Sequence, residues 1–277
     1  MSDNLPKNRK QLFKYLASRW DAVLSVSLLV TLLAVPLIAV IMVQSAVCAN
    51  ITLQMNQAPD NEKAVYVLRL LRAQSVGALV SVVGFYPLCL GLNGAFRYYK
   101  RTVWAEGATI RDDFWQGVKD GLVQSIGVSI LSALTYLFFV SAKWFVQAYI
   151  KTTWLAVVAY IVVAAVIVFA CSIVMYDIAQ HQIYKVGAMQ RLKNSLIFAL
   201  VKFPMNIVFV AAALLPFVVL TFLPEVMGLG VAFVAYAVYC FGLAALLQTL
   251  YCHRVFDKYI NKEAYPQLVG KGLVKDN

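Results

Sequence analysis

The residues best suited to chemistry lie between Gly107 and Ser125, in the stretch GATIRDDFWQGVKDGLVQS. Two neighbouring carboxylates, Asp112 and Asp113, raise the possibility of an acid and base pair. Such a pair must face one substrate, whereas consecutive residues on a helix point about 100° apart. The chain also lacks the GxGxxG, Walker, serine-elbow and HExxH patterns. We therefore predict no catalytic residue and no enzyme.

The same stretch has the pattern of a short amphipathic helix at a membrane surface. Thr109 followed by Asp112 is an acidic capping box, which predicts a helix start at Ile110, and acidic residues in the first turn suit the helix dipole. The sequence therefore predicts a cytoplasmic elbow that leads into a membrane helix near Leu122. Aromatic and charged residues alternate along it, and they form a candidate partner surface: Arg111, Asp112, Asp113, Phe114, Trp115 and Lys119.

A second candidate site is centred on Asn93, in the apolar segment PLCLGLNGAF. A helix kinked at Pro87, with small residues nearby, could open a polar pocket of the kind that carriers use. Alternatively, Gly91 and Gly94 permit close packing while Asn93 donates a hydrogen bond to a neighbouring helix. We favour packing, because no Asp, Glu, Lys or Arg occurs inside the expected spans, and transporters usually place such groups there.

Metal and cofactor chemistry have little support in the sequence. His181 and His253 each follow an apolar run, and Cys252 precedes His253. They lack the HxxxH or CxxC spacing of zinc sites, so we predict no metal and no cofactor. The five cysteines fall mostly within or beside apolar runs, which does not indicate a disulfide framework.

The elements that must carry these residues are membrane helices. Of the 277 residues, 62% are hydrophobic and 13% are charged, against roughly 45–50% and about 25% in soluble domains. Six runs approach the ~20 residues that cross a bilayer as a helix. The sequence predicts an all-α integral membrane six-helix bundle with short cytoplasmic amphipathic helices. The expected spans lie within 22–250, at about 22–47, 76–96, 122–140, 154–176, 207–223 and 226–250.

Positive charge sets the expected orientation. Nineteen Lys and Arg residues fall in segments 1–21, 97–121, 177–206 and 251–277, and five fall in the connections on the other side. This asymmetry predicts cytoplasmic termini. The net charge of +11 then favours contact with anionic lipid headgroups rather than nucleic acid. Segment 1–21 resembles a basic amphipathic helix on the inner leaflet, with Leu12, Phe13, Leu16 and Trp20 on one face, and segment 251–277 is a basic cytoplasmic tail.

Three segments resemble the YesL family of bacterial membrane proteins, whose function is unknown. They are FRYYKRTVWAEGATIRDDFWQGVKDGLVQS, QRLKNSLIFALVKFP and HRVFDKYINKEAYPQLVGKGL. The resemblance covers roughly residues 15–273 and rests on order and spacing. It implies a multi-pass protein of the bacterial plasma membrane, often encoded beside carbohydrate uptake and degradation systems. The family offers no catalytic residues to transfer, and the expected outer loop 48–75 departs from its pattern.

Two functions remain in competition. The first is an accessory or assembly partner of a carbohydrate uptake system, with a sugar transporter complex as its expected partner. The alternative is a channel or carrier for a small solute. A permease subunit driven by an ATPase is disfavoured, because GAMQRLKNSLIFALVKFP lacks the Glu-Ala-Ala of the usual coupling loop. No pattern in the sequence predicts an oligomeric state.

Overall fold

The fold was analysed in a computed structural model that describes residues 7–59, 61–220, 231 and 234–273, without the side chains of 148 and 214–220. The all-helical expectation is confirmed, because 88% of the structure is helix and the described residues contain no strand. The main helices are α1 (Arg9–Ala17), α2 (Trp20–Gln57), α3 (Lys63–Val103), α4 (Trp115–Asp120), α5 (Leu122–Tyr149), α6 (Thr153–Ile183), α7 (Ala188–Val201), α8 (Phe203–Leu220) and α10 (Phe241–Phe256). Shorter pieces are η1 (Ile110–Phe114), η2 (Tyr236–Cys240), η3 (Asp257–Asn261), α11 (Lys262–Ala264) and η4 (Pro266–Leu268).

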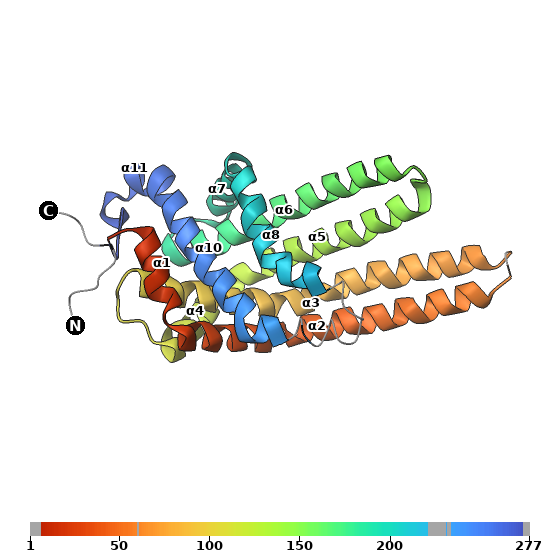
Figure 1. The fold of residues 1–277 in the computed structure, drawn as a ribbon, viewed down its shortest axis with the longest axis horizontal. Coiled ribbons are helices and arrows are strands. Elements are labelled where there is room, and N and C mark those ends of the chain that lie inside the picture. The colour runs from red at the N-terminus through yellow and green to blue at the C-terminus, as the bar shows by residue number, and fades with distance from the viewer. Residues whose placement is uncertain (1–6, 60, 221–230, 232–233, 274–277) are drawn as a thin grey trace.

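Two long antiparallel hairpins, α2–α3 and α5–α6, form the body of the molecule (Figure 1). Both hairpin tips point to one end, and the first and last labelled helices, α1 and α11, lie at the other. We call these the hairpin end and the terminal end. Helix α2 has 38 residues and α3 has 41; at 1.5 Å per residue each is roughly 60 Å long. Both helices are therefore about twice as long as a ~30 Å hydrocarbon core is thick.

Most of the expected outer loop 48–75 is helical in the structure. Helix α2 continues to Gln57 and α3 already begins at Lys63. Sequence reasoning ended the first span where polar residues began to appear. However, a helix needs apolar residues only where lipid surrounds it. The two helices therefore continue beyond their apolar runs and form a helical hairpin.

Among the described residues, four helices are long and apolar enough to cross a membrane: α2, α3, α5 and α6. A fifth span arises if α7 and α8 count as one, although they meet at an angle of 93°. Pro204 lies in the first turn of α8, where its missing N–H prevents α7 from running straight on. The expected spans 207–223 and 226–250 fall partly on 221–230 and 232–233, outside the described residues, so a count of six stays a prediction.

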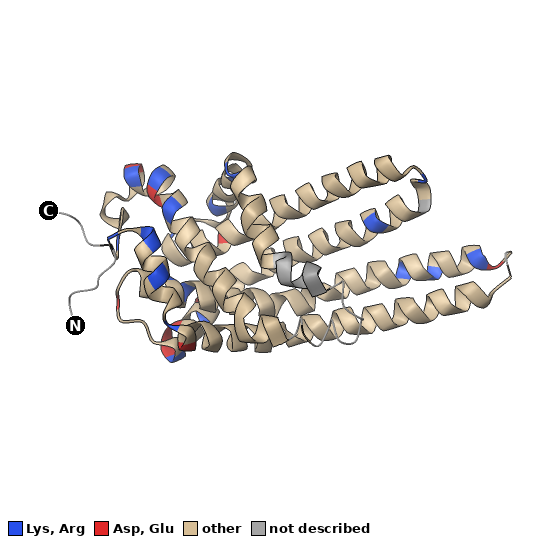
Figure 2. Ribbon diagram, viewed as in Figure 1, with Lys and Arg blue, Asp and Glu red and all other residues tan. Residues whose placement is uncertain are grey.

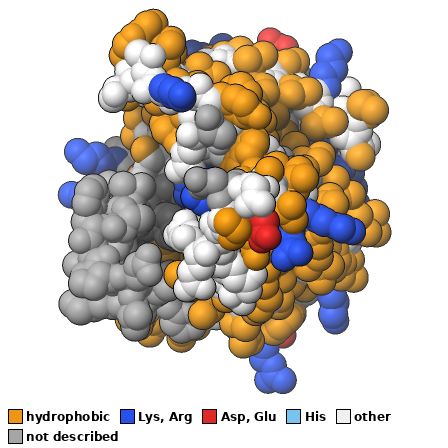
Figure 3. All heavy atoms as spheres, turned by 90° about the vertical axis from the view of Figure 1, so that its right-hand side faces the viewer, with side chains coloured by type: hydrophobic (Ala, Val, Ile, Leu, Met, Phe, Trp, Pro, Cys, Tyr) orange, Lys and Arg blue, Asp and Glu red, His pale blue; other side chains and the backbone are white. Residues whose placement is uncertain are grey.

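Apolar and charged side chains are distributed as in a multi-pass membrane protein. Lys, Arg, Asp and Glu gather at the terminal end, and further basic residues lie toward the hairpin tips (Figure 2). Seen from the hairpin end, hydrophobic side chains cover much of the surface, with basic residues projecting from it (Figure 3). Large apolar residues such as Val83 and Val123 are 69% and 82% exposed. Surface of this kind on long helices indicates contact with lipid.

The N-terminal helix differs from the expected surface anchor. Asn8 caps α1, because its side chain accepts a hydrogen bond from the Gln11 amide at 2.9 Å. Leu12 and Leu16 are 2% and 3% exposed and belong to the core formed with α2, α3 and α10. The expected apolar face is therefore divided: these two leucines pack on protein, whereas Trp20 begins α2 and is 57% exposed.

Candidate functional site

Asn93 lies at the centre of a buried group of polar side chains where α3, α5 and α6 meet. Its side-chain nitrogen donates to Gln124 Oε1 at 2.8 Å and to Ser125 Oγ at 3.2 Å, both on α5. Its Oδ1 accepts from Gln182 Nε2, on α6, at 2.9 Å. A fourth bond joins Asn93 to the Cys89 carbonyl of its own helix. Asn93 is fully buried, so three of its hydrogen bonds tie α3 to neighbouring helices.

The network continues from Gln124 to an ion pair between α6 and α7. The Gln124 side-chain nitrogen donates to one oxygen of Asp177, and Arg191 Nε lies 3.3 Å from the other. The side chains of Asp177 and Arg191 are 13% and 10% exposed. We call this connected set the polar layer. It consists of Asn93, Gln124, Ser125, Asp177, Gln182 and Arg191.

Sequence reasoning missed Asp177 because it ended the fourth span at residue 176. Helix α6 instead continues to Ile183, which places a carboxylate among buried side chains directly after the apolar run. One sequence signal could have found it: Asp177 and Gln180 are three residues apart, and polar residues at this spacing share one face of a helix. This spacing indicates that the helix continues and that the face meets a partner. In the structure Gln180 also contacts α7, through a 2.9 Å hydrogen bond to Ser195.

Closely spaced glycines let the elbow pack directly on α3 beside Asn93. A Cβ atom at Gly94 would lie 2.8 Å from the Phe114 carbonyl oxygen, and one at Gly121 would lie 2.7 Å from Asn93 Cγ. Gly91 faces α2 instead, where a Cβ would stand 3.3 Å from Leu33. The tight approach expected at Gly94 is therefore present, but its partner is the elbow rather than another membrane helix.

The elbow starts where the sequence predicted, at Ile110, but its capping interactions differ. Thr109 donates its backbone N–H to Asp113 Oδ2 at 2.7 Å, whereas Asp112 only accepts from the Thr109 hydroxyl at 3.1 Å. The prediction of a capping box between Thr109 and Asp112 is wrong, because the first turn is π-helical. The wider turn brings the fourth residue after Thr109, rather than the third, back to its amide. Asp113 also forms an ion pair with Arg101 of α3.

The expected partner surface is only partly a surface. Asp113 and Phe114 are buried, at 3% and 0% exposure, against α3. The prediction that these two residues belong to the partner surface is wrong, because the π-helical turn directs both side chains toward the protein. Four of the six residues remain exposed, and we call these four the elbow surface. It consists of Arg111, Asp112, Trp115 and Lys119.

A second buried group lies around His253 at the terminal end, just beyond the expected span 226–250. The ring of His253 packs edge-on against Trp104, with centroids 5.7 Å apart. Its buried Nε2 has no hydrogen bond to any described residue. Burial, with the charges of Arg9 and Lys100 nearby, holds the pKa of His253 well below its usual range. This histidine therefore stays neutral over the physiological range.

The two histidines have different neighbours. His181 lies 2.9 Å from the Asp120 carbonyl oxygen, whereas His253 packs against Trp104. Over the part of the chain that the structure describes, no three His, Cys, Asp or Glu side chains come close enough to hold a metal ion.

The polar layer is equipped for positioning. It contains amides, one hydroxyl and one carboxylate–guanidinium pair, and each member bonds to a residue on another helix. Such interhelical bonds fix helices in register. No family model, no curated protein and no solved structure matches the chain. The resemblance to the YesL family therefore stays a proposal.

Proposed function

We propose that the chain is a multi-pass protein of the bacterial plasma membrane, with six spans and cytoplasmic termini. In this proposal it acts as an accessory or assembly partner of a carbohydrate uptake system. The orientation is supported by nineteen basic residues in the terminal-end segments against five elsewhere. The link to carbohydrate uptake is supported by the sequence resemblance alone.

The main support for binding a partner protein is the exposed elbow surface. Trp115 is 42% exposed and is flanked by the charged groups of Arg111, Asp112 and Lys119. Buried neighbours hold this segment on α3, since Asp113 is paired with Arg101 and Phe114 is fully buried. Exposed Trp and Arg on a rigid support are typical of interaction hot spots. The elbow therefore offers a preformed contact for a cytoplasmic partner domain.

A pull-down with the subunits of a neighbouring sugar transporter tests this role. Trp115→Ala together with Lys119→Glu should abolish capture while leaving expression and membrane insertion unchanged. Trp154→Ala is the matched control, because Trp154 is also exposed, at 65%, but lies at the hairpin end. Capture that survives the double substitution, or is lost equally in the control, contradicts the proposed docking role.

Cysteine labelling tests the orientation. Single cysteines placed near 58 and 147, on a background without the native cysteines, should react with a membrane-impermeant thiol reagent from outside intact cells. Cysteines near 105 and 270 should react only after the membrane is opened. The reverse pattern would invert the proposed topology.

A small-solute carrier is a second candidate, favoured by a cleft toward the hairpin end. This cleft, of about 390 Å³, lies between the α2–α3 hairpin and α5. Its lining includes Gln74, Lys143 and Trp144. At Gln44, the side chain accepts from Tyr136 at 3.0 Å and donates to the Gln74 carbonyl at 3.2 Å. Amides, three hydroxyls and one positive charge would suit a small polar solute.

Uptake by the purified protein in liposomes separates the two candidates. Radiolabelled mono- and oligosaccharides serve as the first probes, with empty liposomes as the control. Uptake that depends on the protein and is lost in Gln44→Ala would favour the carrier. Capture of transporter subunits without uptake would favour the accessory role.

A further inference from the structure

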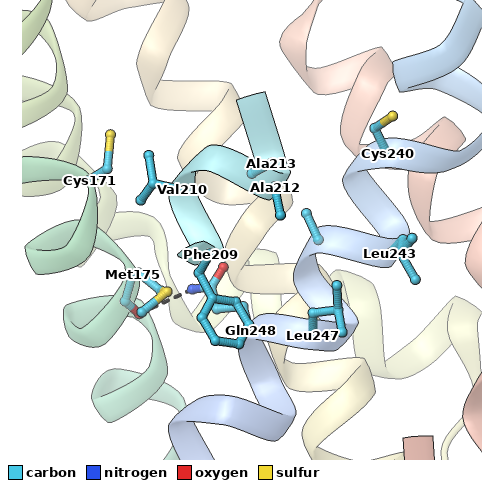
Figure 4. Close-up of a pocket in the computed structure, with 11 residues that line it drawn as sticks. Cys171, Met175, Phe209, Val210, Ala212, Ala213, Cys240, Leu243, Leu247 and Gln248 are labelled. Carbon is cyan, nitrogen blue, oxygen red and sulfur yellow. Dashed lines mark hydrogen bonds between the residues drawn. The ribbon is translucent and has the colours of Figure 1, made fainter. Parts of the chain in front are cut away.

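An apolar cavity of about 270 Å³ lies between α6, α8 and α10. Met175 of α6, Phe209 of α8 and Leu247 of α10 converge on it from three helices (Figure 4). Apart from two cysteines, its lining is apolar except for Gln248, whose Nε2 donates to the Met175 carbonyl at 3.2 Å. The cavity suits a hydrocarbon occupant, because a polar molecule there would find few hydrogen-bonding groups.

An aromatic pair borders this cavity toward the terminal end. Phe209 stacks on Tyr251 with ring centroids 4.3 Å apart, and the Tyr251 hydroxyl lies 3.4 Å from Asn206 Oδ1. Tyr251 is one helical turn beyond Leu247 on α10. Asn206 is fully buried, so the apolar lining of the cavity gives way to buried polar groups within a short distance of Phe209.

Two lysines stand beyond this boundary. The amines of Lys202 and Lys258 lie 4.8 and 5.3 Å from the centre of the exposed Tyr259 ring. A hydrogen bond with Lys202, followed by the charges of both lysines, lowers the pKa of the Tyr259 phenol. Within the described part of the chain, neither lysine forms an ion pair. Half-buried Lys202, at the corner between α7 and α8, and exposed Lys258, on η3, thus concentrate positive charge around Tyr259.

The spacing between the lysines and the cavity matches a phospholipid. Phe209 follows Lys202 by seven residues, which is about 10 Å along α8. The headgroup region of each leaflet is roughly 5–8 Å deep above the hydrocarbon, and a lysine stem can extend toward it. The sharp turn at Lys202 places α7 across the direction of α8, as expected where a chain leaves the interface for the hydrocarbon.

We propose that the surface between α8 and α10 binds one anionic phospholipid, with its phosphate between Lys202 and Lys258 and one acyl chain in the cavity. The charge of the lysine pair selects the headgroup, and the apolar walls accept the chain. The site is independent of the elbow surface, so it adds a ligand to the proposed function rather than depending on it.

Native mass spectrometry of the full-length protein in detergent tests the site, with dioleoyl-phosphatidylglycerol as the probe and dioleoyl-phosphatidylcholine as its uncharged comparison. One phosphatidylglycerol should be retained in preference to phosphatidylcholine. Lys202→Gln and Lys258→Gln should each weaken its binding about five-fold, the usual weight of one basic residue at an anionic surface. Lys193→Gln is the matched control, because Lys193 is an exposed lysine of α7.

The acyl-chain part of the site is tested by filling the cavity. Ala244 lines it, so Ala244→Phe should weaken binding about four-fold for each methylene displaced. Ala211→Phe is the control on exposed, non-lining surface. Equal retention of the two lipids, or unchanged binding in the lysine variants, overturns the proposal even if Ala244→Phe fails to fold. Binding lost only in Ala244→Phe would indicate an uncharged apolar ligand and would also overturn it.

Discussion

Replacing Asn93 by alanine tests whether the polar layer holds the helices together. The substitution removes three hydrogen bonds that cross from α3, to Gln124, Ser125 and Gln182. Interhelical bonds in membranes average about 0.6 kcal/mol, so the bonds alone contribute roughly 2 kcal/mol. Gln124 Oε1 also loses its donor, and a buried group left unpaired costs about 1–3 kcal/mol. We expect a loss of about 3–5 kcal/mol in the free energy of unfolding.

Equilibrium unfolding in mixed micelles with increasing denaturing detergent measures this loss. Asn194→Ala is the matched control, because Asn194 accepts a single, exposed hydrogen bond from Gln190 on the same helix; it should cost less than about 0.5 kcal/mol. A loss below that value in Asn93→Ala would refute the argument that the layer is cohesive. If stability were unchanged while protein-dependent solute uptake disappeared, Asn93 would belong to a transport site.

Three further predictions concern the packing, the elbow and the dependence on pH. Gly94→Ala should cost about 1–3 kcal/mol of unfolding free energy, because its Cβ would lie 2.8 Å from a backbone oxygen. Gly91→Ala should be nearly neutral, because its Cβ contacts are 3.3 Å or longer. Equal losses in the two variants would contradict this difference. Asp112→Asn should lower the free energy of unfolding by no more than about 1 kcal/mol. Asp113→Asn should lower it by roughly 1.5–3 kcal/mol, because it weakens the buried bonds to Thr109 and Arg101. A larger effect at Asp112 would point to a role for the exposed carboxylate. His253 stays neutral in the folded protein but takes up a proton in the unfolded protein below its usual pKa of 6.5. The free energy of unfolding should therefore decrease as the pH is lowered below about 6.5, with a slope approaching about 1.4 kcal/mol per pH unit. Comparing unfolding of the wild type and His253→Phe between about pH 7.5 and 5.5 isolates this slope, and parallel profiles would show that the histidine is not the source.

Much of the architecture follows from local composition. Long apolar runs predict helices wherever they occur, because a helix satisfies its own backbone hydrogen bonds without any partner. This argument identified the bodies of α2, α3, α5 and α6. A polar residue in such a run needs a partner, which is why Asn93 could be selected as a packing or binding residue. The basic segments likewise marked the terminal end.

Helix ends and side-chain pairing were decided by the tertiary structure. The apolar run stops at residue 176, but α6 continues to Ile183 because protein rather than lipid surrounds its last turns. That continuation brings Asp177 to Gln124 and Arg191, which lie 53 and 14 positions away in the chain. A hydropathy pattern sums over neighbours in sequence and cannot register such contacts.

The elbow shows the same division between local pattern and packing. Its sequence determined a helix start at Ile110 and a charged first turn. The π-helical turn then decided that Asp113 lies inward, where Arg101 neutralises it, and that Asp112 lies outward. Two adjacent, chemically identical residues thus acquire different environments, because the protein leaves room for a wider turn against Gly94 that no pattern of residue types specifies.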